Sequence, residues 1–285
     1  MTVSFRDAQA ADIPASAEIM YLAFTNIALK HNFPPDFPHA EATGGILSML
    51  LEAPIFDAIV AEEDGKVLGS IFVSRGSQVG GISIITVDPN AQNVSVGRAL
   101  MEHGMARLKD QGHSRQQLVQ AAYHNRSLCL YTKLGFTACD MLSHMVGDPI
   151  EAEIPGRTVR PAFIDDMDAC NALCRKVHGF DRAEELSGAV HMGIAHVVEC
   201  DGVISGYNTG VGFVGHGVGA SNDDVKAMIA FAHEFMGHGI MIPTTNGELF
   251  RWCLDNGLRL NQQLTLMDTA PTGPANGAYW PNILC

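Results

Sequence analysis

The chain has 285 residues, of which 47% are hydrophobic and 17% charged, and its formal net charge is −13. This length is enough for about two domains, and the composition excludes an intrinsically disordered protein. The negative charge argues against a nucleic-acid partner and favours a cationic small molecule.

The beginning of the chain and its cysteines indicate a compartment. Residues 1–7 lack the apolar stretch of a signal peptide, and no uninterrupted apolar run reaches the ~18 residues of a membrane span. The seven cysteines are scattered without a C-x-x-C pair, which is typical of reduced thiols. We therefore expect a cytoplasmic protein without a membrane partner.

The first half alternates predicted helices and strands, which indicates an α/β fold. The expected strands are 3–6, 57–61, 67–74, 82–86, 117–123 and 141–146. The expected helices are 10–28, 40–51, one from Val96 to a stop at Gly112, and one that contains Tyr131. Residues 31–38 are expected to form a loop, because three prolines in five residues exclude a regular element.

The second half repeats features of the first. Phe5-Arg6-Asp7 with Asp12 is echoed by Val159-Arg160-Pro161 with Asp166, and Leu130-Tyr131 with Gly135-Phe136 by Trp252-Cys253 with Gly257-Leu258. This predicts a tandem duplication with one copy at 1–147, a linker at 148–156 and a degenerate copy at 157–285. The apolar segment 277–285 is expected to pack on the interface between the copies.

The most informative motif starts where the strand 82–86 ends at Asp88-Pro89. A short polar loop then enters an amphipathic helix at Val96. A strand, a loop and a helix N-terminus in this order present backbone N–H groups to an anion. Some 25 residues on comes the run Ser127-Leu128-Cys129-Leu130-Tyr131-Thr132-Lys133-Leu134-Gly135-Phe136.

Together these two motifs resemble the acetyl-CoA-binding and tyrosine-bearing motifs of the GNAT acyltransferase superfamily. The resemblance implies two tandem GNAT-like domains, each a mixed twisted central sheet flanked by helices. It also implies acetyl-CoA as the co-substrate, and no metal. The positions that it assigns to cofactor binding are Ile85, Val87, Gln92, Asn93, Val94, Ser95, Val96, Gly97, Arg98, His124, Arg126 and Ser127.

Ser95 departs from the family pattern, which has a glycine at this position. If the residue needs a positive φ, serine costs on the order of 1–2 kcal/mol. Its hydroxyl could instead contact a phosphate, or Ser95 could simply be the N-cap of the helix. Arg98 could pair with a phosphate or be a solvated surface charge.

Tyr131 stands where the family places its catalytic tyrosine. A neutral phenol is a suitable donor of the proton that the leaving CoA thiolate needs. The alternative is a core aromatic on an apolar helix face. His124 replaces the usual asparagine seven residues earlier, and it could be a hydrogen-bond donor, a base or only a surface histidine at a helix start.

A general base is not assigned by the sequence. An ammonium group with a pKa near 10.4 must lose its proton before it attacks, so a proton path is required. Ser83, Thr86 and Gln120 could at most position water, and Glu62 and Asp57 are candidate bases without further support.

The acceptor is expected to contact the loop 31–39. Its Phe33, Phe37 and Asp36 favour a small amine with an apolar body and a cationic end, and Gln120 is a further candidate substrate residue. The alternative is that the loop aromatics cover the core.

The second copy is expected to have lost the chemistry. Ser221 and Asp224 have the spacing of a capping box, and the following helix is expected to bury Val225, Met228, Ile229, Ala232, Phe235 and Met236 on one face. Cys253 replaces the tyrosine. Neither the pair His233 and His238 nor the set Cys170, Cys174 and His178 has the spacing of a complete metal site, so the two cysteines are expected to be core thiols.

The sequence therefore predicts an N-acetyltransferase that moves an acetyl group from acetyl-CoA to a small primary amine. One alternative is a CoA- or metabolite-binding sensor module without catalysis. Another is an acyltransferase that acts on a protein lysine or N-terminus. Acyl-chain length is left open, and so is a homodimer.

Overall fold

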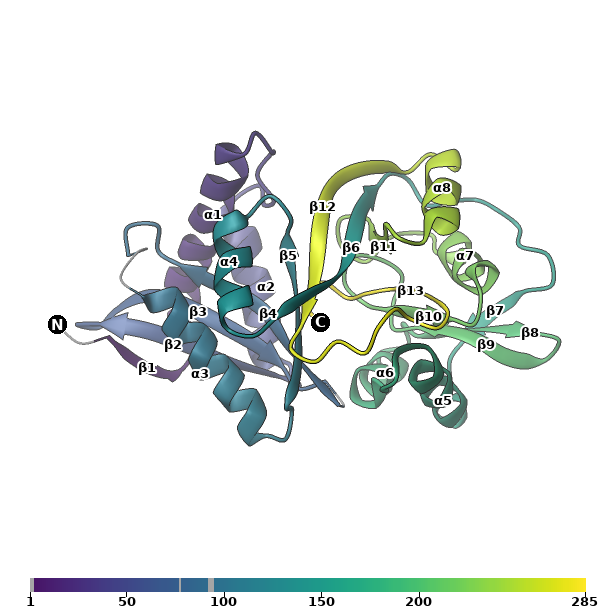
Figure 1. Cartoon of the computed structure of the whole chain (residues 1–285), viewed down its shortest axis with the longest axis horizontal. Coiled ribbons are helices and arrows are strands. Elements are labelled where there is room, and N and C mark those ends of the chain that lie inside the picture. Colours follow the sequence, from purple (N-terminus) through teal and green to yellow (C-terminus); the bar gives the residue numbers. More distant parts are fainter. Residues whose placement is uncertain (1–2, 77, 92–94) are drawn as a thin grey trace. The chain divides into compact units, whose positions relative to one another are not determined.

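The computed structural model describes residues 3–76, 78–91 and 95–285 (Figure 1). These residues form two compact units. The first comprises residues up to 75 together with Gly80–Gln116 and Tyr123–Gly135, and the second comprises Gly76–Val79, Gln117–Ala122 and Phe136–Cys285. The predicted ends of the two sequence copies, at residues 147 and 157, stay a prediction. The compact units are defined by contacts in space and not by sequence repetition.

The first unit is built on four neighbouring strands, each antiparallel to the next: β1 (Ser4–Asp7), β2 (Phe56–Glu63), β3 (Lys66–Ser74) and β4 (Val79–Val87). Asp64 and Gly65 join β2 to β3 with φ of +50° and +78°. Two successive positive φ values are typical of a two-residue hairpin turn, in which Asp-Gly is a preferred pair.

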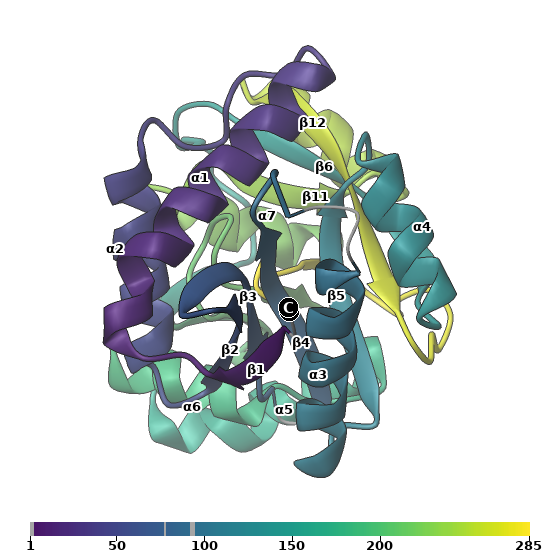
Figure 2. The ribbon, with the colours of Figure 1, turned by 90° about the vertical axis from the view of Figure 1, so that its left-hand side faces the viewer.

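Helices cover both faces of these strands. Helices α1 (Ile13–Lys30) and α2 (Ala40–Glu52) lie on one side, and α3 (Val96–Asp110) lies on the other (Figure 2). A short helix, α4 (Asn125–Lys133), ends the unit. Gly104 lets α3 approach β3 closely, because a Cβ there would lie 2.7 Å from Cδ1 of Ile71. The predicted helices and strands of this half are confirmed, with ends shifted by a few residues.

Arg6 on β1 ties the start of α1 to the sheet. Its guanidinium donates to both carboxylate oxygens of Asp12 at 2.7 and 2.8 Å and to Glu62 on β2 at 2.9 Å. Asp12 also accepts from the backbone N–H of Gln9 at 2.8 Å. One carboxylate thus closes the first turn and holds the arginine.

The same arrangement recurs in the second unit. Arg160 donates to Asp166 at 2.7 and 2.9 Å and to Glu199 at 2.9 Å, and Asp166 accepts from the N–H of Phe163 at 2.8 Å. Each half therefore has one arginine that binds two carboxylates beside its first helix, and this repeated arrangement confirms the tandem duplication.

The second unit contains a sheet in the order β13-β10-β9-β8-β7. Its strands are β7 (Thr158–Pro161), β8 (His196–Cys200), β9 (Val203–Asn208), β10 (Gly217–Gly219) and β13 (Ala278–Trp280). Val197 packs with α5 (Met167–His178) and α6 (Ala183–His191), whereas its neighbour Val198 packs with α7 (Asn222–Phe231). Successive strand residues point to opposite faces, so helices cover both faces of this sheet as well.

Strands from the two halves of the sequence pair within the second unit. Their order is β5 (Arg115–Ala121), β12 (Arg259–Asp268), β6 (Thr137–Val146) and β11 (Ile240–Pro243). β12 follows α8 (Gly247–Asp255) and lies antiparallel to both β5 and β6, while β6 also pairs with β11. Each half therefore gives its last long strand to a strand of the other half, which is why the compact units do not follow the sequence halves.

Helix α7 is shorter than the sequence predicts. It ends at Phe231, and Ala232 is extended with ψ of 126°. The N–H of Met236 instead donates to the carbonyl of Val211 at 2.8 Å. The prediction that Phe235 and Met236 continue the helix face was wrong, because backbone pairing with residue 211 replaces the next helical turn.

Among the helices of the described residues, none combines the length and the apolarity needed to cross a bilayer.

Candidate functional site

Strand β4 and the turn after it form the first part of the site. Ile85 and Val87 are half-buried on one face of β4, whereas Ile84 and Thr86 are buried on the other. Asp88 ends the strand, since its carboxylate accepts from the backbone N–H of Asn90 at 2.9 Å. In such a turn the aspartate side chain binds the backbone two residues later, so the strand does not continue.

Ser95 lies directly before α3 in a left-handed conformation, with φ of 67° and ψ of 3°. Ser95 is the N-cap residue of α3, as one of the alternatives from the sequence has it, but its side chain makes no capping hydrogen bond to the helix. The positive φ agrees with the glycine of the family pattern, and a non-glycine residue there costs on the order of 1–2 kcal/mol. Gln92, Asn93 and Val94 lie outside the described residues.

The first turn of α3 contains the other predicted loop residues. Val96 is buried in the core, and Gly97 lies beside Val87, where a Cβ would make an ordinary contact of 3.5 Å. Arg98 is exposed and pairs with Glu102 one turn later at 3.0 Å. An exposed pair of this kind is weak and leaves the guanidinium available to an anion.

His124 caps helix α4. Its Nδ1 accepts from the backbone N–H of Ser127 at 3.1 Å, and its Nε2 lies 3.3 Å from the Ser127 hydroxyl. In the second unit Asn246 caps α8 in the same way, accepting from the N–H of Leu249 at 3.3 Å. With Nδ1 occupied as an acceptor, His124 holds the helix start in place, and Arg126 is exposed on the first turn.

Tyr131 lies one turn further along α4, with 7% of its surface exposed. Burial raises the pKa of its phenol, and a hydrogen bond with Ser127 opposes this shift only in part. The phenol is therefore neutral at physiological pH and retains the proton that a general acid needs. The structure places Ser127 and Tyr131 on one short helix, with His124 as the N-cap residue of that helix.

The His124 cap predicts a pH-dependent stability. Burial lowers the pKa of His124 below its ordinary value, so the folded protein favours neutral imidazole. As the pH falls below about 6.5, the unfolded chain takes up this proton first and folding is disfavoured. His124→Asn keeps a capping side chain without a titrating group. We expect the wild type to lose about 1 kcal/mol of unfolding free energy relative to this variant between pH 8 and pH 5.

Urea unfolding of both proteins at several pH values checks this expectation. Stability curves that stay parallel down to pH 5 would contradict it.

Tyr123, which the sequence reasoning missed, stacks on Phe33 with ring centroids 4.5 Å apart and lies 5.3 Å from the ring of His31. Burial raises its pKa to about 12, and the charge of Asp36 adds to this shift. Phe37 instead packs edge-on against Phe24 of α1. The loop after α1 thus places Phe33 and Asp36 beside Tyr123. The position of this tyrosine directly before His124 could have identified it from the sequence.

The candidate bases have structural partners. Glu62 is bound by Arg6, and Asp57 accepts from the side chain of Gln111 at 2.6 Å. The Thr86 hydroxyl lies 3.4 Å from that of Ser70 on the buried face of the sheet. Gln120 belongs to the second unit, where it is buried and its amide has no partner among the described residues.

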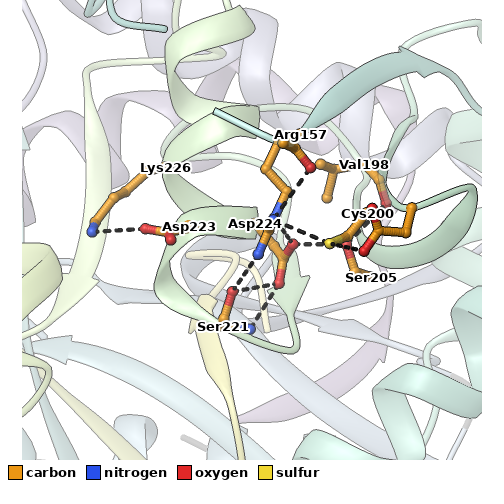
Figure 3. A network of polar contacts seen from close by, with 10 residues as sticks. Arg157, Val198, Cys200, Ser205, Ser221, Asp223, Asp224 and Lys226 are labelled. Atoms are coloured by element: carbon orange, nitrogen blue, oxygen red, sulfur yellow. Dashed lines mark hydrogen bonds and ion pairs between the residues drawn. The ribbon is translucent and has the colours of Figure 1, made fainter. Parts of the chain in front are cut away.

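The corresponding helix start in the second copy is closed by carboxylates (Figure 3). Asp224 is 1% exposed and accepts from the backbone N–H and the hydroxyl of Ser221 at 2.9 and 2.7 Å. Arg157 donates to the other oxygen at 2.6 Å, as does Ser205 at 2.7 Å. The predicted capping box is confirmed, so the position that a phosphate would need at this helix holds a carboxylate.

The cysteines of α5 belong to the core. Cys170 and Cys174 are both fully buried among apolar side chains, as expected. Within the part of the chain that the structure describes, no group of three or more His, Cys, Asp or Glu side chains is placed to hold a metal ion.

Residues 54–138 match the family model of the acetyltransferase (GNAT) domain. A mycothiol acetyltransferase from Cellulomonas flavigena is 33% identical over 126 residues, which are 37% of this chain and 36% of that protein. Another, from Pseudarthrobacter chlorophenolicus, is 29% identical over 139 residues, 45% of this chain and 42% of that protein. The chain thus spans less than half the length of these curated relatives.

Solved structures resemble nearly the whole chain. A proposed acetyltransferase from Pyrococcus horikoshii has a TM-score of 0.70 at 15% identity, and the match covers 97% of this chain and 94% of that one. A tandem GNAT protein from the clavulanic acid biosynthesis pathway has a TM-score of 0.54 at 12% identity over 96% and 99% of the two chains. At these identities the likeness shows the fold alone. Residues 54–138 of this chain therefore match a GNAT acetyltransferase domain, and they lie within a fold that nearly the whole chain shares with a tandem GNAT protein.

Proposed function

We propose that the protein transfers an acetyl group from acetyl-CoA to a small primary amine by direct attack in a ternary complex. The observation that carries this proposal is Tyr131, a buried neutral phenol on the helix that follows the strand-loop-helix motif. The GNAT domain match and the relatives named mycothiol acetyltransferase support acetyl transfer. A cytoplasmic location and a homodimer stay predictions.

Acetyl-CoA, the co-substrate of GNAT acetyltransferases, would lie along β4. Backbone groups of Ile85 and Val87 would hold the pantetheine arm. The N–H groups at the start of α3 would hold the pyrophosphate, with Arg98 and Arg126 as nearby cations. The roles of Gln92, Asn93 and Val94 rest on the family pattern alone.

In the proposed reaction the amine nitrogen attacks the thioester carbonyl carbon, and the carbon–sulfur bond of the tetrahedral intermediate then breaks. Tyr131 donates its proton to the leaving sulfur, and solvent returns a proton to the phenolate. The proton that the amine loses goes to a base that we do not assign.

The acceptor is proposed to have an apolar body and a cationic amine. Phe33 and Tyr123 present a stacked pair of rings beside the acidic side chain of Asp36. Rings of this kind favour apolar or cationic groups, and the carboxylate attracts the ammonium. Phe37 contributes through its contact with Phe24.

The second candidate function is a CoA-binding module without catalysis. The observation that favours it is that Glu62 and Asp57, the two candidate bases, are held by Arg6 and Gln111. Release of CoA thiol in the presence of an amine distinguishes the two candidates.

A calorimetric titration of acetyl-CoA followed by a thiol-release assay with a panel of primary amines tests the proposal. We expect about one site per chain and amine-dependent thiol release. Gly97→Asp places a carboxylate at the start of α3 and should abolish binding, whereas Asn222→Asp at the start of α7 is the matched control and should not. Binding without turnover would support the sensor, and no binding would refute both.

A further inference from the structure

Strand β13 occupies a position in the second copy that has a counterpart in the first. It pairs antiparallel with β10, with Val218 opposite Tyr279, and it also contacts β11. In chain order β10 precedes α7 as β4 precedes α3, and β11 precedes α8 as β5 precedes α4. β13 therefore lies along β10 where the pantetheine arm is proposed to lie along β4 (Figure 1).

The strands fit closely because β10 contains glycines. Trp280 is fully buried, and a Cβ on Gly217 would lie 2.2 Å from its ring. A Cβ on Gly277 would lie 2.7 Å from the carbonyl oxygen of Gly219. The backbone of β10 is thus covered by the segment 277–285 at van der Waals contact.

The end of this segment is anchored to the partly buried carboxylate of Glu185. The Asn282 amide donates to Glu185 at 2.9 Å. The same carboxylate is bound by Arg182 at 3.0 Å and lies 3.1 Å from Nδ1 of His216. Asn282 is therefore one of the partners that stabilise the partly buried carboxylate of Glu185, and its removal leaves that carboxylate with one hydrogen bond fewer.

Beyond β13, a cavity of about 460 Å³ remains at the starts of α7 and α8, lined by Asn222, Asn246 and Tyr279 among others. Its lining includes the carboxylate of Asp140, which does not suit a phosphate. Asp223 and Asp224 lie in the first turn of α7, and their cationic partners, Lys226 and Arg157, are already paired with them (Figure 3).

We propose that the segment 277–285 is a built-in occupant of the second copy's pantetheine cleft, so that the chain carries one acyl-CoA site instead of two. The inference rests on the proposed function, because it takes β4 of the first copy as its reference. A peptide strand can replace a pantetheine arm here because both pair with an exposed strand edge through backbone-type hydrogen bonds.

The first test displaces the segment and follows Trp280. The chain has two tryptophans, so Trp252→Phe leaves Trp280 as the only one. In this background Gly217→Ala drives a methyl group into the Trp280 ring. Gly188→Ala is the matched control, since a Cβ there meets nothing within 4 Å. We expect acrylamide to quench Trp280 at least about threefold more efficiently in the first variant than in the control.

Asn282→Asp provides a second variant that changes no packing at Trp280. It places a carboxylate against Glu185, whereas Asn276→Asp makes the same change at an exposed position of the preceding loop. Trp280 should again become accessible only in the first of the two. If Trp280 stays shielded in both displaced variants, the segment is an integral strand of the sheet and the proposal is wrong.

The second test asks what the opened cleft binds. Pantetheine, which lacks phosphates, is titrated into Asn282→Asp and Asn276→Asp after acetyl-CoA has filled the first copy. We expect saturable binding to the first variant only, and its absence there, with Trp280 exposed, would overturn the proposal. A chain that binds no acetyl-CoA would instead refute the proposed function, and the Trp280 results would be unaffected.

Discussion

Tyr131→Phe is expected to lower turnover with a primary amine at least about 100-fold, because it removes the proposed general acid. The affinity for acetyl-CoA should change by less than about twofold, since the ring still fills its buried position. The hydroxyl that is removed belongs to a neutral phenol hydrogen-bonded to Ser127.

Tyr21→Phe is the matched control, because it removes a hydroxyl from a partly buried tyrosine on α1 of the same unit. Thiol release measures turnover, and calorimetry measures acetyl-CoA binding. Turnover of Tyr131→Phe equal to that of the control would show that Tyr131 is only a core aromatic.

The second large effect is expected at Asp224, where substitution by alanine should lower the free energy of unfolding by about 3–5 kcal/mol. Asp224 is buried and accepts four hydrogen bonds, from Arg157, Ser205 and the backbone and side chain of Ser221. Its removal uncaps α7 and leaves the guanidinium of Arg157 without its closest partner.

The neighbouring Asp223→Ala is the control. Asp223 is exposed, and its partner Lys226 also pairs with Glu248, so the loss of Asp223 should cost less than about 1 kcal/mol. Urea unfolding of both variants gives the comparison. Equal losses for the two substitutions would mean that the buried network contributes no more than a surface pair.

The acetyl-CoA stoichiometry of Asp224→Ala can be measured separately from its stability. If the first copy holds the acyl-CoA site, Asp224→Ala should leave the stoichiometry near one per chain wherever the variant is folded. The stability of the second copy and the binding at the first would then be separate properties of the chain.

Features that depend on a few neighbouring residues could be predicted from the sequence. The helix and strand pattern of the first half, the capping box at Ser221 and Asp224, and the core position of Cys174 all follow from local spacing. The repeated Arg-Asp pattern was visible for the same reason, because Asp12 lies six residues after Arg6.

The conformation of Ser95 could be predicted only in part from the sequence. The family pattern has a glycine at this position, which left a positive φ open, and the structure has φ of 67° there. The sequence spacing could not show whether the Ser95 hydroxyl caps α3, because capping depends on the φ and ψ of Ser95. In the left-handed conformation that the structure has, the Ser95 side chain makes no capping hydrogen bond.

Pairings between distant residues were decided only by the tertiary structure. β12 lies between β5 and β6, Arg157 reaches Asp224, Tyr123 stacks on Phe33, and β13 pairs with β10. Side-chain periodicity states which face of an element is apolar but not which partner covers it. The sequence by itself therefore determined the repeated α/β elements and the tyrosine helix, while the exchange of strands and the closed second cleft arose from packing between residues far apart in the chain.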